Sequence, residues 1–196
     1  MASKNIKLRS ELKKLVGEQV EDIILFGSTV RGKRKPRDTD ILVVFKKKVI
    51  KEAEYQIRKK LEQYFPGVAL ISKTSGTLLE PTFDARESAL FEGMSLITGQ
   101  NLARRYGFIS FGMFKYTFGK WEKLQKTKFY YALNGRKGNK GISQKLECLK
   151  LSDRIILAPL GNIEPFREFL DSWKLEYTYV PTMIPERLSH KKILEA

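Results

Sequence analysis

The sequence predicts an α/β fold in its first hundred residues, followed by a second, small α+β unit. Two apolar runs, 20–26 and 41–45, lack the alternation of a half-exposed strand and are typical of strands covered on both faces. Helical spacing of apolar residues predicts amphipathic helices at 6–16 and 49–65. A further strand is expected at 68–71, so helices and strands alternate as in an α/β domain.

After the strand at 68–71 the spacing of apolar residues is less regular. Thr82 is the expected N-cap of a helix that runs to about Glu92. The C-terminal part predicts a helix at 122–133 and then a β-α-β arrangement, in which Asn162 caps the helix and residues 175–180 form the last strand. A change of composition near residue 100 predicts two domains, 1–99 and 100–196.

Composition excludes several classes of protein. The chain has 196 residues, 42% of them hydrophobic and 30% charged, as in globular proteins, and no apolar run approaches the roughly 18 residues of a membrane span. The N-terminal residues are charged where a signal peptide would be apolar, so a cytoplasmic location is expected. A lone Cys148 and a lone His190, expected to be a tail residue, exclude an internal disulfide and a Cys/His zinc site.

The positive charge is concentrated in one stretch. The formal net charge is +15, and residues 101–140 alone hold 10 Lys/Arg against 1 Asp/Glu, whereas 141–196 hold 8 of each. The same stretch contains 10 of the 22 aromatic residues; four of them, Phe111, Phe114, Trp121 and Tyr131, are expected in the core. A localised basic patch with aromatic residues favours a nucleic-acid partner, RNA over DNA. The candidate contacts, chosen by charge clustering, are Arg104, Arg105, Lys115, Lys120, Lys123, Lys126, Lys128, Arg136, Lys137 and Lys140.

The residues that point to chemistry lie around the first two strands. Asp38 and Asp40, one residue apart at the entry of a strand, are expected to project to the same side and share a divalent cation, for which Mg²⁺ is suited. The preceding strand ends at Gly27-Ser28, where a glycine permits close approach of a phosphate and the serine offers its hydroxyl and its N–H. Arg31 adds positive charge beside them. These are the parts that phosphoryl and nucleotidyl transfer require.

This arrangement resembles the polymerase-beta nucleotidyltransferase superfamily. A strand ending in Gly27-Ser28, an Arg-Gly shortly after, and Asp38-Thr39-Asp40 opening the next apolar strand form its signature. The small archaeal and bacterial nucleotidyltransferase-domain proteins are similar over about residues 6–99. The resemblance implies a mixed sheet with flanking helices, a nucleoside triphosphate such as ATP as donor, and two Mg²⁺ ions. Matched residue by residue, Gly27 and Ser28 would hold phosphates, while Asp38 and Asp40 would be catalytic and bind metal.

One feature departs from that superfamily. Its members usually carry a third carboxylate on the strand after the long helix, and here that strand, Gly67–Ser72, contains no acid. The group normally helps to activate the acceptor hydroxyl, so its absence bears on turnover more than on nucleotide binding. Glu80, Asp84 and Glu87 are the nearby acids that would have to substitute.

Three functions are compatible with these observations. The first is a Mg²⁺-dependent nucleotidyltransferase that transfers a nucleoside monophosphate to a hydroxyl of nucleic acid or protein. The second is a catalytically degenerate relative that binds RNA or DNA, alone or in a ribonucleoprotein. The third is one half of a toxin–antitoxin pair, in which the basic region would contact an acidic protein partner.

Overall fold

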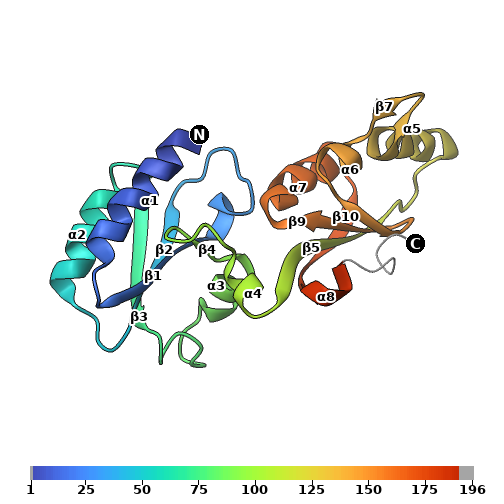
Figure 1. Cartoon of the computed structure of the whole chain (residues 1–196). Helices are drawn as coiled ribbons and strands as arrows, with labels where there is room; N and C mark the ends of the chain where they lie inside the picture. The colour runs from blue at the N-terminus through green and yellow to red at the C-terminus, as the bar shows by residue number, and fades with distance from the viewer. Residues whose placement is uncertain (1, 190–196) are drawn as a thin grey trace. The chain divides into compact units, whose positions relative to one another are not determined.

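The computed structural model describes residues 2–189, and its internal contacts divide the chain into two compact units, Met1–Tyr106 and Gly107–Ala196 (Figure 1). Each unit has its own four-stranded sheet with helices packed against it, which confirms an α/β fold with a mixed sheet and flanking helices, followed by a small α+β unit. Independent folding of domains 1–99 and 100–196 stays a prediction. His190 lies outside the described residues. No helix among those described is long and apolar enough to cross a membrane.

The N-terminal unit is built on a mixed sheet of order β3-β2-β1-β4, in which β1 and β2 are antiparallel and β2 and β3 are parallel. In chain order its elements are α1 (Ala2–Val16), β1 (Val20–Phe26), the short 3-10 turn η1 (Gly27–Thr29), β2 (Thr39–Phe45), α2 (Lys51–Leu61), β3 (Val68–Thr74), α3 (Arg86–Glu92), β4 (Met94–Ser95) and α4 (Leu102–Arg105).

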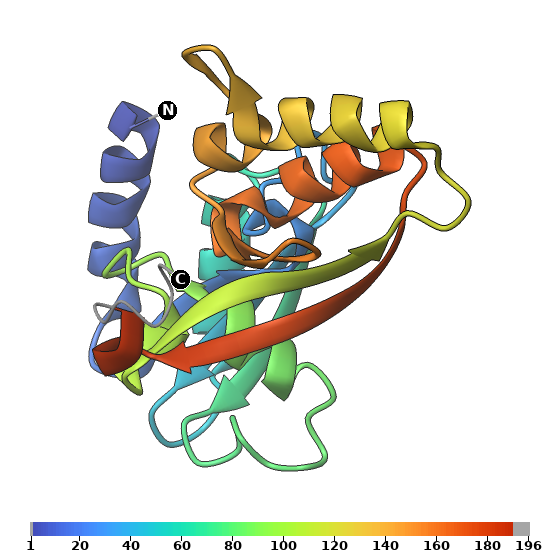
Figure 2. The same ribbon diagram turned by 90° about the vertical axis from the view of Figure 1, so that its right-hand side faces the viewer.

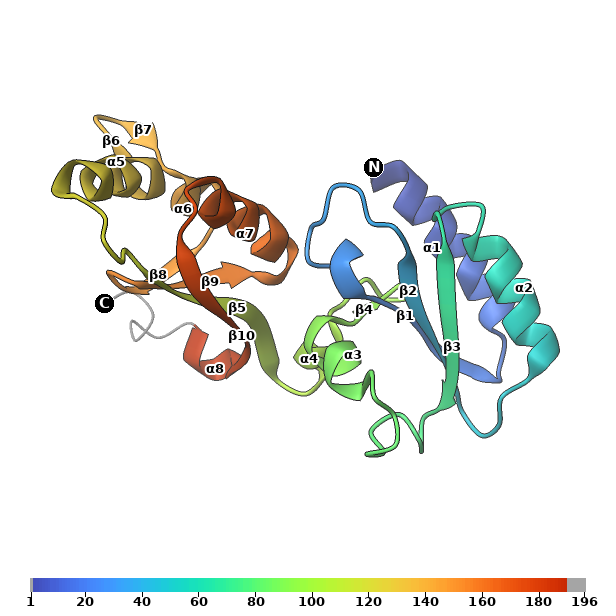
Figure 3. The same cartoon turned by 180° about the vertical axis from the view of Figure 1, so that it is seen from behind.

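Both faces of this sheet are covered, as the unbroken apolar runs predict. On one face Ile23 and Ile41 pack with residues of α1 and α2, and on the other Ile24 and Leu42 pack with residues of α3, α4 and the segment before α3. Figures 1 and 3 show α1 and α2 on one side of this sheet and α3 and α4 on the other. Because consecutive strand residues alternate between two cores, β1 and β2 are held rigidly, and so is the edge where β1 ends.

The predicted start of the third helix is wrong by three residues. The helix α3 begins at Arg86, not after Thr82. The reason is Phe83, whose side chain is only 4% exposed in the core and whose N–H donates to the carbonyl oxygen of Glu80 in a turn. Burial of one aromatic side chain therefore outweighs the local capping signal.

A buried ion pair fastens the last elements of this unit to β1. The carboxylate of Asp22 is 2% exposed, accepts a hydrogen bond from the Ser95 hydroxyl at 2.7 Å and pairs with the guanidinium of Arg105. These two contacts offset part of the cost of burying the carboxylate, and they link β4 and α4 to β1.

The C-terminal unit is an antiparallel sheet of order β10-β5-β9-β8 with helices packed on it. Figure 2 shows its two long strands, β5 and β10, running side by side. In chain order its elements are β5 (Phe108–Thr117), α5 (Lys123–Asn134), β6 (Gly135–Arg136), β7 (Asn139–Lys140), α6 (Ile142–Lys145), β8 (Leu149–Ser152), β9 (Ile155–Pro159), η2 (Leu160–Asn162), α7 (Ile163–Ser172), β10 (Glu176–Pro185) and α8 (Glu186–Ser189).

Most aromatic residues of the basic stretch build this unit's core. Phe114 and Phe129 are 0% exposed; Phe114 packs edge-on against Phe166 with ring centroids 5.2 Å apart, and Phe129 contacts Trp121 and other rings. The expectation that Tyr131 also belongs to the core is wrong, because its side chain is 42% exposed on the outer side of α5. The number of aromatic residues in a stretch therefore does not show which of them face the core and which face solvent.

Candidate functional site

The candidate site lies where β1 ends and β2 begins. The chain leaves β1 through the single turn Gly27–Thr29, and the carbonyl oxygen of Ser28 accepts a hydrogen bond from the N–H of Lys33 at 3.1 Å. Because β1 and β2 are antiparallel neighbours, Phe26 pairs with Asp40. The glycine-serine turn and the predicted acidic pair therefore share one edge of the sheet.

Gly27 is required by the position of Asp40. Its φ of +79° lies in the left-handed region that favours glycine. A Cβ atom built on Gly27 would lie 2.1 Å from Oδ2 of Asp40. The carboxylate of Asp40 thus lies directly over the glycine, so the turn and Asp40 form one packed unit.

The two acids flank a residue that faces the opposite way. Thr39 is fully buried, and its hydroxyl donates to the carbonyl oxygen of Pro66 at 2.9 Å. Asp40 is half-buried, while Asp38, which lies just before the first residue of β2, is exposed. Alternation along the chain places both carboxylates on the face away from Thr39.

Electrostatics show that the two carboxylates interact. Burial raises the pKa of Asp40, the charge of Asp38 raises that pKa further, and the charge of Arg31 opposes both effects. Two like charges held near each other at an open edge are stabilised by a divalent cation, and Mg²⁺ needs only one or two carboxylates when water and phosphate oxygens complete its shell. The residues present therefore fit a magnesium ion.

We expect the Asp40→Asn variant to be more stable than the wild type at neutral pH in the absence of metal. A carboxyl group whose pKa is raised by folding contributes its full stability below the pKa of the unfolded chain, and this contribution is lost as pH rises through the folded-state pKa. Asparagine does not ionise, so the advantage of the variant should be small in acid and grow toward neutral pH. Urea unfolding in the presence of a chelator, measured across this pH range, checks the trend; a variant less stable than the wild type at neutral pH would contradict it.

Glu92, at the end of α3, is a site residue that sequence reasoning missed. Its side chain is 4% exposed; Oε1 accepts a hydrogen bond from the N–H of Gly27 at 2.9 Å, and Oε2 accepts one from the guanidinium of Arg31 at 2.6 Å. The contact joins residues more than sixty positions apart, so local pattern does not reveal it. The available signal was an acid three residues after Ala89 on an otherwise apolar helix face. Glu92 positions the turn and Arg31 rather than facing solvent.

The strand beside Asp40 carries no third carboxylate. β3 runs parallel to β2, and Ala69 pairs with Asp40, so Ala69 and Ile71 occupy the places on the Asp40 face where a further acid would lie. Both are exposed. Within residues 2–189 no group of three or more His, Cys, Asp or Glu side chains is placed to hold a metal ion, so Asp38 and Asp40 have no third carboxylate beside them.

The ten predicted nucleic-acid contacts fall into different places. Arg104 and Arg105 lie in α4 of the N-terminal unit, where Arg105 pairs with Asp22. Lys115 lies on β5 and Lys120 in the loop after it. The remaining six lie on α5 or on the β6–β7 hairpin: Lys123, Lys126, Lys128, Arg136, Lys137 and Lys140.

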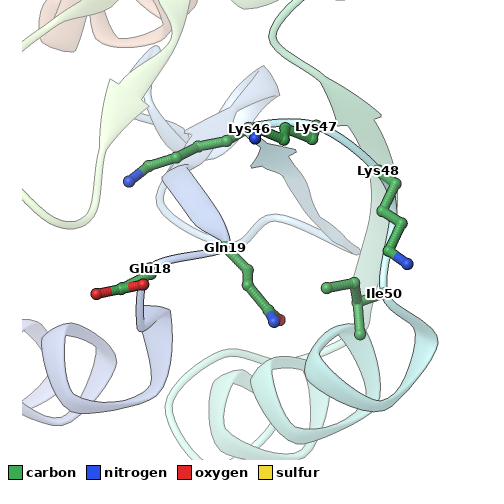
Figure 4. Close-up of a pocket in the computed structure, with 6 residues that line it drawn as sticks. All are labelled: Glu18, Gln19, Lys46, Lys47, Lys48 and Ile50. Atoms are coloured by element: carbon green, nitrogen blue, oxygen red, sulfur yellow. The ribbon is translucent and has the colours of Figure 1, made fainter.

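A pocket of the N-terminal unit lies away from the acidic pair. Its cavity of about 290 Å³ is lined by residues just before β1 and just after β2, which are the opposite ends of the two strands from Gly27 and Asp40. Figure 4 shows the ammonium groups of Lys46 and Lys48 pointing away from each other. These two lysines therefore do not converge on one ligand.

Comparison with known families gives a match to the first part of the chain. Residues 6–75 match the model of the nucleotidyltransferase domain, a range that includes Gly27, Ser28, Asp38 and Asp40, and this confirms the resemblance drawn from those residues. Among solved structures, a mutant form of the toxin–antitoxin pair MntA–HpeT is similar, with 18% sequence identity over 50% of this chain and 78% of that chain and a TM-score of 0.36. A comparison with curated proteins gave no match.

Proposed function

We propose that the chain is a magnesium-dependent nucleotidyltransferase. It transfers a nucleoside monophosphate from a nucleoside triphosphate to a hydroxyl group of an acceptor, with nucleic acid, and RNA in particular, favoured over protein. The observation that carries the proposal is the packing of the Asp40 carboxylate over Gly27, beside Asp38, within the segment that matches the nucleotidyltransferase domain.

The residues of the turn supply what the triphosphate needs. The Ser28 hydroxyl and N–H are proposed to hold a phosphate oxygen, with Gly27 keeping the backbone close, although the N–H of Gly27 itself is bound to Glu92. Arg31, held by Glu92, adds positive charge next to Asp40. An active enzyme would bind two Mg²⁺ ions, which Asp38 and Asp40 would hold. The ions would neutralise charge on the phosphates.

The reaction itself is a displacement at phosphorus. An oxygen of the acceptor hydroxyl forms a bond to the α-phosphorus, the bond from that phosphorus to the bridging oxygen of the β-phosphate breaks, and pyrophosphate leaves with the electron pair. The hydroxyl proton of the acceptor passes to solvent water. Transfer of this kind depends on positioning and on charge neutralisation, so a nucleophilic side chain of the protein is not needed.

The direct test is incubation with each α-labelled nucleoside triphosphate and Mg²⁺, in the presence of RNA, DNA or protein. The proposal expects the label on one acceptor class, with release of pyrophosphate. Absence of transfer to every acceptor, together with intact nucleic-acid binding, would instead support the alternative of a catalytically degenerate protein that binds RNA or DNA. Retention of a protein partner of acidic composition would support a toxin–antitoxin pair.

The lack of an acid on β3 favours the alternative of a catalytically degenerate protein. Its effect can be tested by placing an acid on this strand. We expect Ala69→Asp to raise the affinity for Mn²⁺ or Mg²⁺ at least about tenfold, because unit charges 4 Å apart attract by about 1 kcal/mol even in water and the ion carries two. Ala69→Asn is the matched control, since it has the same shape and no charge. Transfer activity that rises in the aspartate variant alone would show that the missing carboxylate limits turnover; equal metal affinity in both variants would contradict the placement of the site.

A further inference from the structure

A basic surface without acids lies on the C-terminal unit. Residues 123–146 contain seven Lys or Arg residues and no Asp or Glu, and they form α5, the β6–β7 hairpin and α6. We call its outward part the α5–hairpin surface, which comprises the exposed residues Leu124, Lys128, Tyr131, Arg136, Lys137 and Lys140.

The hairpin is held firmly against the end of α5. A Cβ atom built on Gly135 would lie 2.1 Å from the carbonyl oxygen of Asn139, and one built on Gly141 would lie 2.3 Å from that of Leu133. The buried hydroxyl of Ser143 donates to the same Leu133 carbonyl at 2.6 Å. With its base packed this closely, the hairpin presents its charges in a fixed position relative to the helix, which lowers the entropy lost on binding.

The side chains of Tyr131 and Arg136 form a cation–π contact on this surface. The guanidinium carbon of Arg136 lies 4.5 Å from the centre of the Tyr131 ring. The neighbouring rings of the helix are used differently, because Phe129 is in the core and Tyr130 packs on Phe118. A tyrosine turned outward and covered by a guanidinium offers stacking surface, and both groups stack on unpaired bases.

The tip of the hairpin carries charge at a conformational cost. Lys137 and Gly138 form the two-residue turn between β6 and β7 with φ values of +49° and +83°. Asparagine is preferred over lysine at the first position of such a turn. Lys137 therefore places a positive charge at the exposed tip of the hairpin in a backbone conformation that asparagine would adopt more readily.

We propose that the α5–hairpin surface binds single-stranded nucleic acid, with Tyr131 and Arg136 stacking on a base and the lysines contacting phosphates. Apart from Glu122 at the start of α5, no acid of this segment repels a phosphate backbone, and stacking requires a base that is not paired in a duplex. This inference deepens the acceptor part of the proposed function. The binding itself requires neither metal nor triphosphate, so its failure and the failure of catalysis are separable.

The test is fluorescence anisotropy with labelled oligouridine, the matching single-stranded DNA and a DNA duplex, without Mg²⁺ or nucleotide, over a series of salt concentrations. We expect Tyr131→Ala to weaken single-strand binding roughly 5- to 100-fold and Tyr131→Phe to preserve it. Lys137→Asn should lower the log-log salt slope by about 0.7 while leaving the fold at least as stable.

The N-terminal unit offers a matched control. Tyr55 is 51% exposed on α2, with the ammonium of Lys59 5.3 Å from its ring centre, but this helix carries acids as well. Tyr55→Ala should leave binding unchanged. Equal loss in the Tyr55 and Tyr131 variants, unchanged binding by Tyr131→Ala, tighter binding of duplex than of single strands, or binding of anionic lipid vesicles in place of oligonucleotides would each overturn the proposal.

Discussion

We expect the Asp40→Asn variant to lose nucleotidyl transfer by roughly 10³-fold or more, because it removes a charge from the group that is to hold the metal against the triphosphate. Asp38→Asn should have a similar effect. Neither change removes a buried contact of the core, and Asp40→Asn relieves a carboxyl group whose pKa is already raised by burial and by Asp38. Transfer from α-labelled triphosphate and the urea unfolding midpoint, measured on the same preparations, check both parts.

Glu62→Gln provides the control for loss of a carboxylate. Glu62 follows α2 on the other face of the sheet and is 52% exposed in its side chain, with Arg58 at 4.0 Å. A surface pair of this kind contributes little, so the variant should keep full activity. Activity of Asp40→Asn equal to that of Glu62→Gln would remove the enzymatic proposal.

The second large effect is expected from Gly27→Ala. Both Gly27 and Gly17 have positive φ, at +79° and +52°, but a Cβ atom on Gly17 would meet nothing within 4 Å, whereas on Gly27 it would collide with the Asp40 carboxylate. Each alanine costs about 1–2 kcal/mol of backbone strain. Only Gly27→Ala also displaces Asp40, and displacement of a site group by about 1 Å can reduce activity about 100-fold.

The pair of glycine variants therefore separates stability from function. We expect a loss of unfolding free energy in both variants, at least as large in Gly27→Ala because of the added collision, with transfer activity retained in Gly17→Ala and lost in Gly27→Ala. If both variants keep activity, the carboxylate over Gly27 has no part in the reaction. The free energy of unfolding and the rate of label transfer are the two measurements required.

The N-terminal half of the fold was accessible from sequence because its signals are local. The apolar runs of β1 and β2 gave no sign of a solvent face, and the structure covers both faces of each strand. The acidic pair and the glycine-serine turn lie at the ends of these two strands, so strand pairing alone brings them to one edge. Glu92 was not predicted as a site residue because its partners, Gly27 and Arg31, are distant in the chain.

The C-terminal half was harder to predict for a physical reason. The strand β5, at Phe108–Thr117, was not predicted, because Ile109 and Phe111 on one face and Phe114 and Tyr116 on the other leave no alternation of polar and apolar residues. Tyr131 was placed in the core by the density of neighbouring rings, although its helical position turns it outward. Which aromatic residue is buried depends on the packing of α5 and α7 on the sheet, and sequence spacing does not contain that information.

The central claim is that Asp38 and Asp40 jointly bind a divalent cation in front of the Gly27–Ser28 turn. It is tested most directly by a crystal structure of the protein with Mn²⁺ and a non-hydrolysable nucleoside triphosphate, using the anomalous signal of manganese. We expect a manganese peak between the two carboxylates and the phosphates. Manganese bound elsewhere, or phosphates bound with neither acid as a ligand, would contradict it.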